Sequence, residues 1–165
     1  MFIRSEVFQS TGGFDRSFFA HMEEIDLCWR IKHRGHSIRC IPQSVVFHMG
    51  GATLDKSNPT KTYYNFRNNL SMLYKNLPAG KFYSILPIRL ILDGIAGIKF
   101  LAEGDLKDCL AVIRAHFAFY AKLINGTLKR EKVIRKDIQP VYGHSIIIEH
   151  FISGKKKYSE LKQGT

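Results

Sequence analysis

Apolar side chains recur at helical spacing in two parts of the chain. In residues 22–34, Leu27 and Ile31 lie four positions apart, with acids in the first turn, bases in the last and Gly35 directly afterwards. This arrangement suits the helix dipole and the glycine that often ends a helix. From residue 61 onward, "TKTYYNFRNNLSMLYKNL" places aromatic residues and leucines at three- and four-residue steps. The spacing predicts helices from there to about residue 136.

Two short runs between these regions have a different pattern. "HSIRCIP" (36–42) and "SVVFHM" (44–49) are rich in β-branched residues, are separated by a proline and end at a glycine pair. Such runs are typical of strands. The sequence therefore predicts an α/β portion in residues 1–60, followed by a helical and basic extension in residues 61–165.

Composition indicates a folded domain. The chain has 165 residues, of which 45% are hydrophobic, enough for one core. Cys28, Cys40 and Cys109 are an odd number, widely spaced and set among apolar neighbours, so we interpret them as reduced core thiols and expect no disulfide framework or zinc site. The opening "MFIRSEVFQSTGG" lacks the apolar core of a secretory signal, which favours a cytoplasmic location.

The charge of the chain favours an anionic partner. The formal net charge is +11, and Lys and Arg are in excess in residues 121–165. No nucleic-acid recognition motif accompanies this charge, so we expect no nucleic-acid partner. The anionic partner that we expect instead is the membrane surface at the inner face of the cell membrane, and Lys155–Lys157 are one basic cluster that could contact it. The most apolar segment, residues 85–102, is interrupted by charged residues, so we do not expect it to span a bilayer.

Acids crowd beside apolar residues in "FFAHMEEIDLCWR" (18–30). A carboxylate of Glu23 or Glu24 at a helix start is favoured as an anion by the dipole, whereas apolar surroundings would raise its pKa. Such a group is either a general base or an ordinary first-turn acid on a surface helix. Asp26 and Arg30 are four apart and would pair on an exposed face. Trp29 would face either an acceptor or the packed core.

Residues 12–51 resemble the latter part of the catalytic domain of family 2 glycosyltransferases, and more narrowly bacterial rhamnosyltransferases. The motifs that carry this resemblance are Gly12-Gly13-Phe14-Asp15, an acidic pair followed by "IDLCWR", and His-Met-Gly-Gly beyond the two predicted strands. The resemblance implies a GT-A mixed-sheet domain and inverting transfer of a sugar from a nucleotide-sugar to a glycan or lipid-linked acceptor, in polysaccharide assembly.

The resemblance also implies roles for particular residues. Glu24 is similar in position to the base that deprotonates the acceptor hydroxyl, with Glu23 beside it as the alternative. The family usually has Glu-Asp where this chain has Glu-Glu. Four further residues would contact the acceptor: Gly13, Asp26, Trp29 and Arg30.

His48 is similar to a histidine that in some relatives helps to hold the divalent metal, Mn²⁺ or Mg²⁺, of the donor diphosphate. Its alternative is a strand-end histidine bonded to a carbonyl. The Asp-x-Asp motif and the nucleotide-binding half of the family precede the matching region, and this chain contains neither. We therefore expect a fragment that binds no metal and transfers no sugar alone. The alternative function is a non-enzymatic helical module that binds anionic membranes through residues 85–165.

Overall fold

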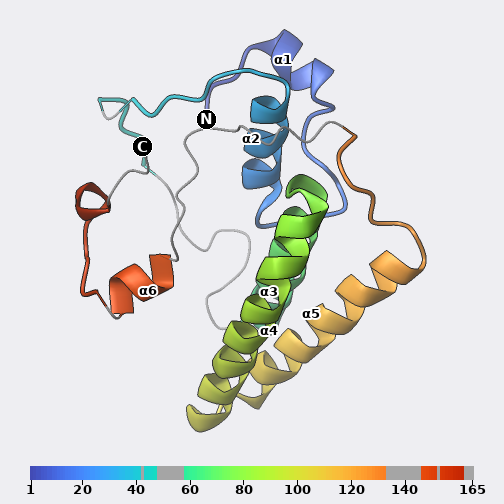
Figure 1. Cartoon of the computed structure of the whole chain (residues 1–165), viewed down its shortest axis with the longest axis vertical. Coiled ribbons are helices and arrows are strands. Elements are labelled where there is room, and N and C mark those ends of the chain that lie inside the picture. The colour runs from blue at the N-terminus through green and yellow to red at the C-terminus, as the bar shows by residue number, and fades with distance from the viewer. Residues whose placement is uncertain (42, 48–57, 133–145, 152, 162–165) are drawn as a thin grey trace. The chain divides into compact units, whose positions relative to one another are not determined.

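The computed structural model describes residues 1–41, 43–47, 58–132, 146–151 and 153–161, and in these ranges it is helical (Figure 1). The contacts divide the chain into two units, Met1–Ile134 and Arg135–Thr165. The helices of the first unit are α1 (Ser5–Ser10), α2 (Glu23–His33), α3 (Pro59–Asn76), α4 (Ala79–Ala102) and α5 (Leu106–Ile124). The second unit contains α6 (Ile146–Phe151) and the 3₁₀ helix η1 (Tyr158–Glu160).

Local sequence signals account for the ends of the long helices. Helix α3 begins where the Asn58 side chain accepts a hydrogen bond from the Thr60 N–H, at 2.9 Å, with proline at the first helical position. It ends before Pro78, the residue that caps the start of α4. The Asp105 side chain caps α5, and Gly104, at φ +81°, makes the turn between α4 and α5. The predicted helices at 22–34 and from 61 onward are thus confirmed as far as Ile124, whereas residues 125–132, also predicted to be helical, are not, and residues 133–136 lie outside the described residues.

The core of the first unit lies where α3, α4 and α5 pack together. Helix α5 packs against both α3 and α4, while α2 packs against α3. The buried cluster consists of Leu70, Leu77, Phe82, Phe119 and Leu128. Residues on three helices and on the segment after α5 thereby share one apolar interior, which is the main source of stability for helices of this length.

The expected α/β class, with its GT-A mixed sheet, is wrong for the part of the chain that the structure describes. Residues 36–41 and 44–47, predicted to be strands, are coil there, and the described ranges hold no strand. A strand needs a neighbour to bond its backbone groups, and the described residues supply none. Val45, Val46 and Phe47 are exposed instead.

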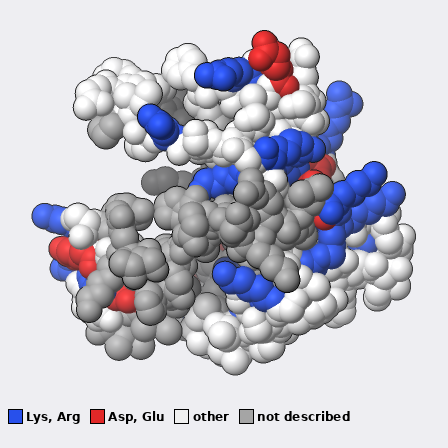
Figure 2. Space-filling view, turned by 45° about the horizontal axis from the view of Figure 1, so that its top comes forward, with Lys and Arg blue, Asp and Glu red and all other residues white. Residues whose placement is uncertain are grey.

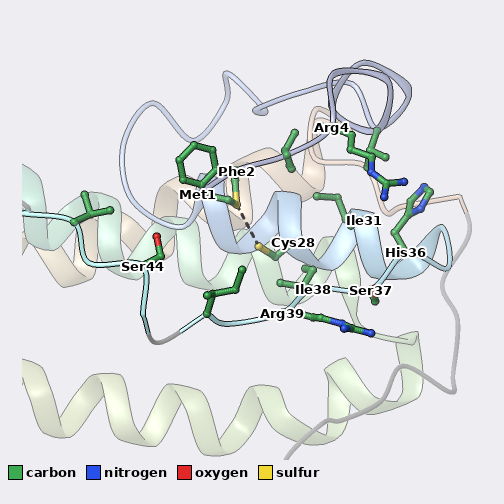
Figure 3. Close-up of a pocket in the computed structure, with 14 residues that line it drawn as sticks. Met1, Phe2, Arg4, Cys28, Ile31, His36, Ser37, Ile38, Arg39 and Ser44 are labelled. Carbon is green, nitrogen blue, oxygen red and sulfur yellow. Dashed lines mark hydrogen bonds between the residues drawn. The ribbon is translucent and has the colours of Figure 1, made fainter.

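The coil after α2 runs back alongside that helix. Figure 3 shows Ile38 and Arg39 of the coil near Cys28 and Ile31 of α2, with Met1 and Phe2 on the other side of Cys28. Together they border a cavity of about 530 Å³. The Cys28 thiol lies 3.9 Å from the Met1 sulfur, and burial, followed by the nearby Glu24 carboxylate, raises its pKa. Cys40 is exposed rather than in the core, and all three cysteines are free.

Candidate acid-lined site at the start of helix α2

The loop that leads into α2 has an unusual backbone. Phe19, His21 and Met22 have φ values of +65°, +68° and +72°, in the left-handed region that side chains other than glycine rarely adopt. Met22 is also the residue that caps α2, without a side-chain capping bond. Such strain persists only where the surroundings enforce it, and it concentrates at functional sites.

Two residues of α3 hold this loop in place. The Asn68 side-chain amide donates to the carbonyls of Phe18, Ala20 and His21, at 2.7–2.9 Å. The Arg67 guanidinium donates to the carbonyls of Ser17, at 2.9 Å, and of Phe18, at 3.2 Å. Both side chains are buried. The loop geometry is therefore imposed by a helix about 50 residues further along the chain.

A buried polar network fixes α2 itself; it consists of Asp15, Asp26, Arg30, Lys75 and Asn76. Asp26 is 0% exposed and accepts from Arg30 Nε at 2.8 Å, from Lys75 Nζ at 3.0 Å and from Asn76 Nδ2 at 2.9 Å. The predicted pair of Asp26 and Arg30 is confirmed, but its expected position on an exposed face is wrong. Buried charges require this degree of pairing.

Arg30 connects this network to the glycine turn. Its two terminal nitrogens donate to the carbonyls of Thr11, at 2.5 Å, and of Gly13, at 2.7 Å. Gly13 has φ +64°, and a Cβ placed there would lie 3.1 Å from the Phe8 ring, so both the backbone angle and the space favour glycine. Gly13, Asp26 and Arg30 thus stabilise the structure around the site.

Asp15 lies where the network reaches the surface. Burial opposes ionisation of its carboxyl group, but hydrogen bonds from the Lys75 ammonium and the Ser17 backbone outweigh burial and lower the pKa to about 2. The Lys75 Nζ to Asp15 Oδ2 distance is 2.6 Å. Asp15 is therefore a firmly ionised acid that accepts hydrogen bonds and does not take up protons at neutral pH.

The loop and the first turn of α2 enclose a cavity of about 720 Å³, which we call the acid cavity. Its lining residues are Met1, Phe14, Asp15, Arg16, Phe19, Glu23 and Glu24. Glu24 is exposed, whereas Glu23 is half-buried and its Oε2 is buried without a hydrogen-bond partner among the described residues. Phe14 and Phe19 are 47% and 71% exposed. The cavity thus combines three carboxylates and the Arg16 side chain with two accessible aromatic rings.

Trp29 lies away from this cavity. It is half-buried, packs against the core cluster and meets the His33 ring edge-on, with the ring centroids 6.2 Å apart. His33 is buried, and the His33 Nε2 lies 3.1 Å from the Asn76 carbonyl oxygen. Of the two positions considered for Trp29, the structure places it at the core.

The described residues do not suit a resident divalent metal. No three His, Cys, Asp or Glu side chains within the described ranges come together as a ligand set, although Asp15, Glu23 and Glu24 all line the acid cavity. His48, the predicted metal contact, lies outside the described residues. No chemical step is therefore assigned to a metal here.

Sequence reasoning missed the α3 residues that organise the site: Arg67, Asn68, Lys75 and Asn76. The signal was present, because polar residues at these spacings share one side of a helix that otherwise repeats leucines and aromatic residues. A polar set on the inward side of a helix indicates a buried network.

Comparisons with protein-family models, with curated proteins and with solved structures each found no match. The class of protein is thus defined by structure alone: a helical unit in which a strained loop leads into a helix that begins with two adjacent glutamates. Of the helices that the structure describes, none combines the length and the apolar character that a bilayer crossing requires. Lys and Arg cover more of the face in Figure 2 than Asp and Glu do.

Proposed function

We propose that the acid cavity is the acceptor and base side of a glycosyl-transfer site, at which a sugar leaves a nucleotide-sugar for a glycan or lipid-linked acceptor. One observation carries this proposal. Glu23 and Glu24 directly follow a strained loop that buried bonds from α3 hold in place, and they lie beside two exposed aromatic rings. Strained loops on rigid supports are a common setting for catalytic groups. The resemblance of residues 12–51 to family 2 glycosyltransferases supports the same reaction class.

The chemistry requires one proton acceptor. The acceptor hydroxyl attacks the anomeric carbon, the bond from that carbon to the diphosphate breaks, and the nucleoside diphosphate leaves with the bonding electron pair. Meanwhile the hydroxyl proton moves to a carboxylate, which we assign to Glu24. A carboxylate within hydrogen-bond reach of the hydroxyl is suited to this task.

The two glutamates have different surroundings, and these suggest different roles. Glu24 is exposed at the cavity, so it can reach an incoming hydroxyl and release its proton to water afterwards. Glu23 has a buried oxygen without a hydrogen-bond partner among the described residues, and a second acceptor hydroxyl would satisfy it. We therefore propose Glu23 as an orienting group, and as the base if Glu24 is not.

The remaining residues of the site act in two ways. Phe14 and Phe19 offer apolar ring faces, against which the C–H faces of a sugar can pack. Gly13, Asp26 and Arg30 act indirectly, by fixing the glycine turn and α2. Trp29 is assigned to the core that supports α2.

The proposal also includes a sugar donor and a cellular location for the reaction. A nucleotide-sugar with Mn²⁺ or Mg²⁺ is the donor that the resemblance implies, but the described residues offer no ligand set for the metal. We place the reaction at the cytoplasmic face of the cell membrane, because a net charge of +11 favours an anionic leaflet.

Acceptor binding tests the proposal without requiring turnover. Saturation-transfer NMR of the 165-residue chain against a panel of rhamnose-, galactose- and N-acetylglucosamine-containing oligosaccharides is expected to show binding. Phe19→Ala should weaken it roughly three- to tenfold, through loss of an aromatic contact. Phe2→Ala is the matched control, because Phe2 is also exposed but does not line the acid cavity. Absence of binding to every glycan, or equal loss in both variants, would overturn the proposal.

A further inference from the structure

Helix α4 has an apolar side that no described part of the chain covers. Ile88, Ile91, Ile95 and Ile98 follow one another at steps of three and four, and they are between 57% and 68% exposed. Residues at these steps form a stripe along one side of a helix. Its opposite side packs towards the core through Phe82.

Helix α5 repeats this arrangement. Its exposed apolar residues are Leu106, Leu110, Ile113, Phe117 and Ile124, again at steps of three, four and seven. Phe117 is 71% exposed and Ile124 is 87% exposed, which are unusual values for side chains of this size in a folded chain. Two neighbouring helices therefore each carry an outward stripe.

A hollow between the helices adjoins both stripes, and we call the two stripes and this hollow together the apolar face. A cavity of about 490 Å³ lies between the helices, and its lining includes Leu90, Ile98 and Leu101 from α4 and Ile113 and Phe117 from α5. Ile98, Ile113 and Phe117 thus belong both to the stripes and to the hollow. Continuous exposed apolar surfaces of this kind mark sites of interaction.

The charges around the apolar face are mainly basic at its borders. Lys81 and Lys99 are exposed and lie about five helical turns apart, so they border the same edge of α4, away from the hollow. Lys107 is exposed on α5, on the side away from the hollow. The acids Asp93 and Asp108 are buried, whereas Asp105, which caps the start of α5, is exposed. Exposed Glu103 lies in the turn between the helices and forms a solvent-exposed pair with Lys99 at 3.7 Å, a type of pair that is weak.

The single acid within the hollow is paired. Asp93 accepts from Arg89 Nη2 at 2.7 Å, and its other oxygen lies 3.1 Å from His116 Nε2. This pairing leaves the surface without an uncompensated negative charge at its centre. An apolar surface bordered by lysines matches a bilayer interface, where acyl chains take the apolar groups and anionic headgroups take the ammonium groups.

We propose that the apolar face of α4 and α5 inserts into the interfacial layer of an anionic lipid bilayer, with the hairpin lying along the membrane surface. The lysines at its borders contact headgroup phosphates, and the isoleucines and Phe117 enter the acyl region. This proposal locates the membrane contact in apolar side chains rather than in the basic residues near the C-terminus. It does not depend on the acid cavity or on sugar transfer.

Vesicle binding by charge-matched variants tests insertion. The 165-residue chain is expected to sediment with phosphatidylcholine vesicles that contain phosphatidylglycerol. Ile95→Glu and Phe117→Glu should each reduce the partition coefficient at least about tenfold, because a charge enters the lipid-facing surface. Gln9→Glu changes net charge equally on the exposed surface of α1 and should retain most of the binding. Circular dichroism of each variant checks that the helices remain.

Two further measurements separate insertion from simple charge attraction and from self-association. In a Trp29→Phe background, Phe117→Trp should be quenched by brominated lipid, whereas Phe2→Trp should not. Replacing Lys81, Lys99 and Lys107 together by Gln should weaken binding to anionic vesicles without changing the helix content. Absence of vesicle binding, equal binding by Ile95→Glu, or a stable dimer that Ile95→Glu dissociates would each overturn the proposal.

Discussion

At the scale of single residues, Glu23 and Glu24 differ in surroundings although they are adjacent in the chain. Both lie in the first turn of α2, where backbone N–H groups favour negative charge. The helical rotation of about 100° between neighbours turns Glu24 to solvent and leaves one Glu23 oxygen buried. One position suits proton exchange with water, and the other suits a fixed hydrogen bond to a ligand.

In the proposed transfer reaction, Glu24→Gln is expected to lower the turnover number about 10²- to 10⁴-fold with little change in donor affinity, because a base acts mainly in the transition state. The measurement is nucleoside diphosphate release under saturating acceptor. Glu23→Gln is the comparison, with a smaller loss expected and a higher KM for acceptor. Near-normal turnover in Glu24→Gln together with an inactive Glu23→Gln would transfer the base role to Glu23.

The lowered pKa of Asp15 predicts that the stability of the folded chain depends on pH in the acid range. Its pKa in the folded chain is about 2, below the ordinary value of 3.8, so the folded state binds this proton less readily than the unfolded state does. The stability that Asp15 contributes is therefore fully present above about pH 4 and is lost as the pH falls towards 2.

Urea unfolding between pH 2 and pH 6 checks this expectation. The free energy of unfolding of the unchanged chain should exceed that of Asp15→Asn above pH 4, and the difference should shrink as the pH falls. Lys75 keeps its bond to Asp26 in the variant, so the fold should persist. A pH-independent difference would contradict the depressed pKa.

At the scale of elements, α3 is the organiser of the candidate site. One side of it packs apolar residues against α5, and Arg67 and Asn68 hold the loop before α2. Lys75 and Asn76, two turns further on, hold Asp26. A single helix thereby connects the core of the first unit with the geometry of the acid cavity.

Asn68→Ala should release this loop. The carbonyls of Ala20 and His21 lose the Asn68 donor, while that of Phe18 keeps only the bond from Arg67. We expect the free energy of unfolding to fall by about 1–3 kcal/mol for buried groups left unsatisfied. Glycan binding at the acid cavity should weaken as well, since the strained loop is no longer held. Asn69→Ala is the matched control on the neighbouring, half-buried position. Similar effects of both substitutions would show that the bonds of Asn68 do not hold the loop.

At the scale of the whole molecule, the contacts separate residues 1–134 from residues 135–165. The core cluster, the buried network and the acid cavity all lie in the first unit. A chain of residues 1–134 should therefore keep the helix content of α2 to α5 and unfold in one cooperative transition. Thermal unfolding followed by circular dichroism checks this, with the 165-residue chain as reference. Loss of cooperativity in the shorter chain would mean that residues 135–165 contribute to its core.

Much of the helical structure followed from the sequence because its signals are local. Charges at both ends of α2, Asn58-Pro59 at the start of α3 and Gly104 after α4 all act within one or two turns. The strand prediction failed because β-branched composition cannot supply the partner strand that backbone pairing requires. The positions of Glu23 and Glu24 in a first turn were also predictable, but their different exposure was not.

The sequence by itself determined the helical regions, both ends of α2 and the acidic start of that helix, since these depend on residues close together in the chain. Only the tertiary structure decided that Asp26 and Arg30 are buried, that Asn68 bonds a loop about 50 residues away, and that the isoleucines of α4 face outward. A helical stripe of apolar residues has the same spacing in the sequence whether it packs against a core or faces solvent. Which of the two it meets depends on contacts between distant elements, and those contacts leave no signature in local spacing.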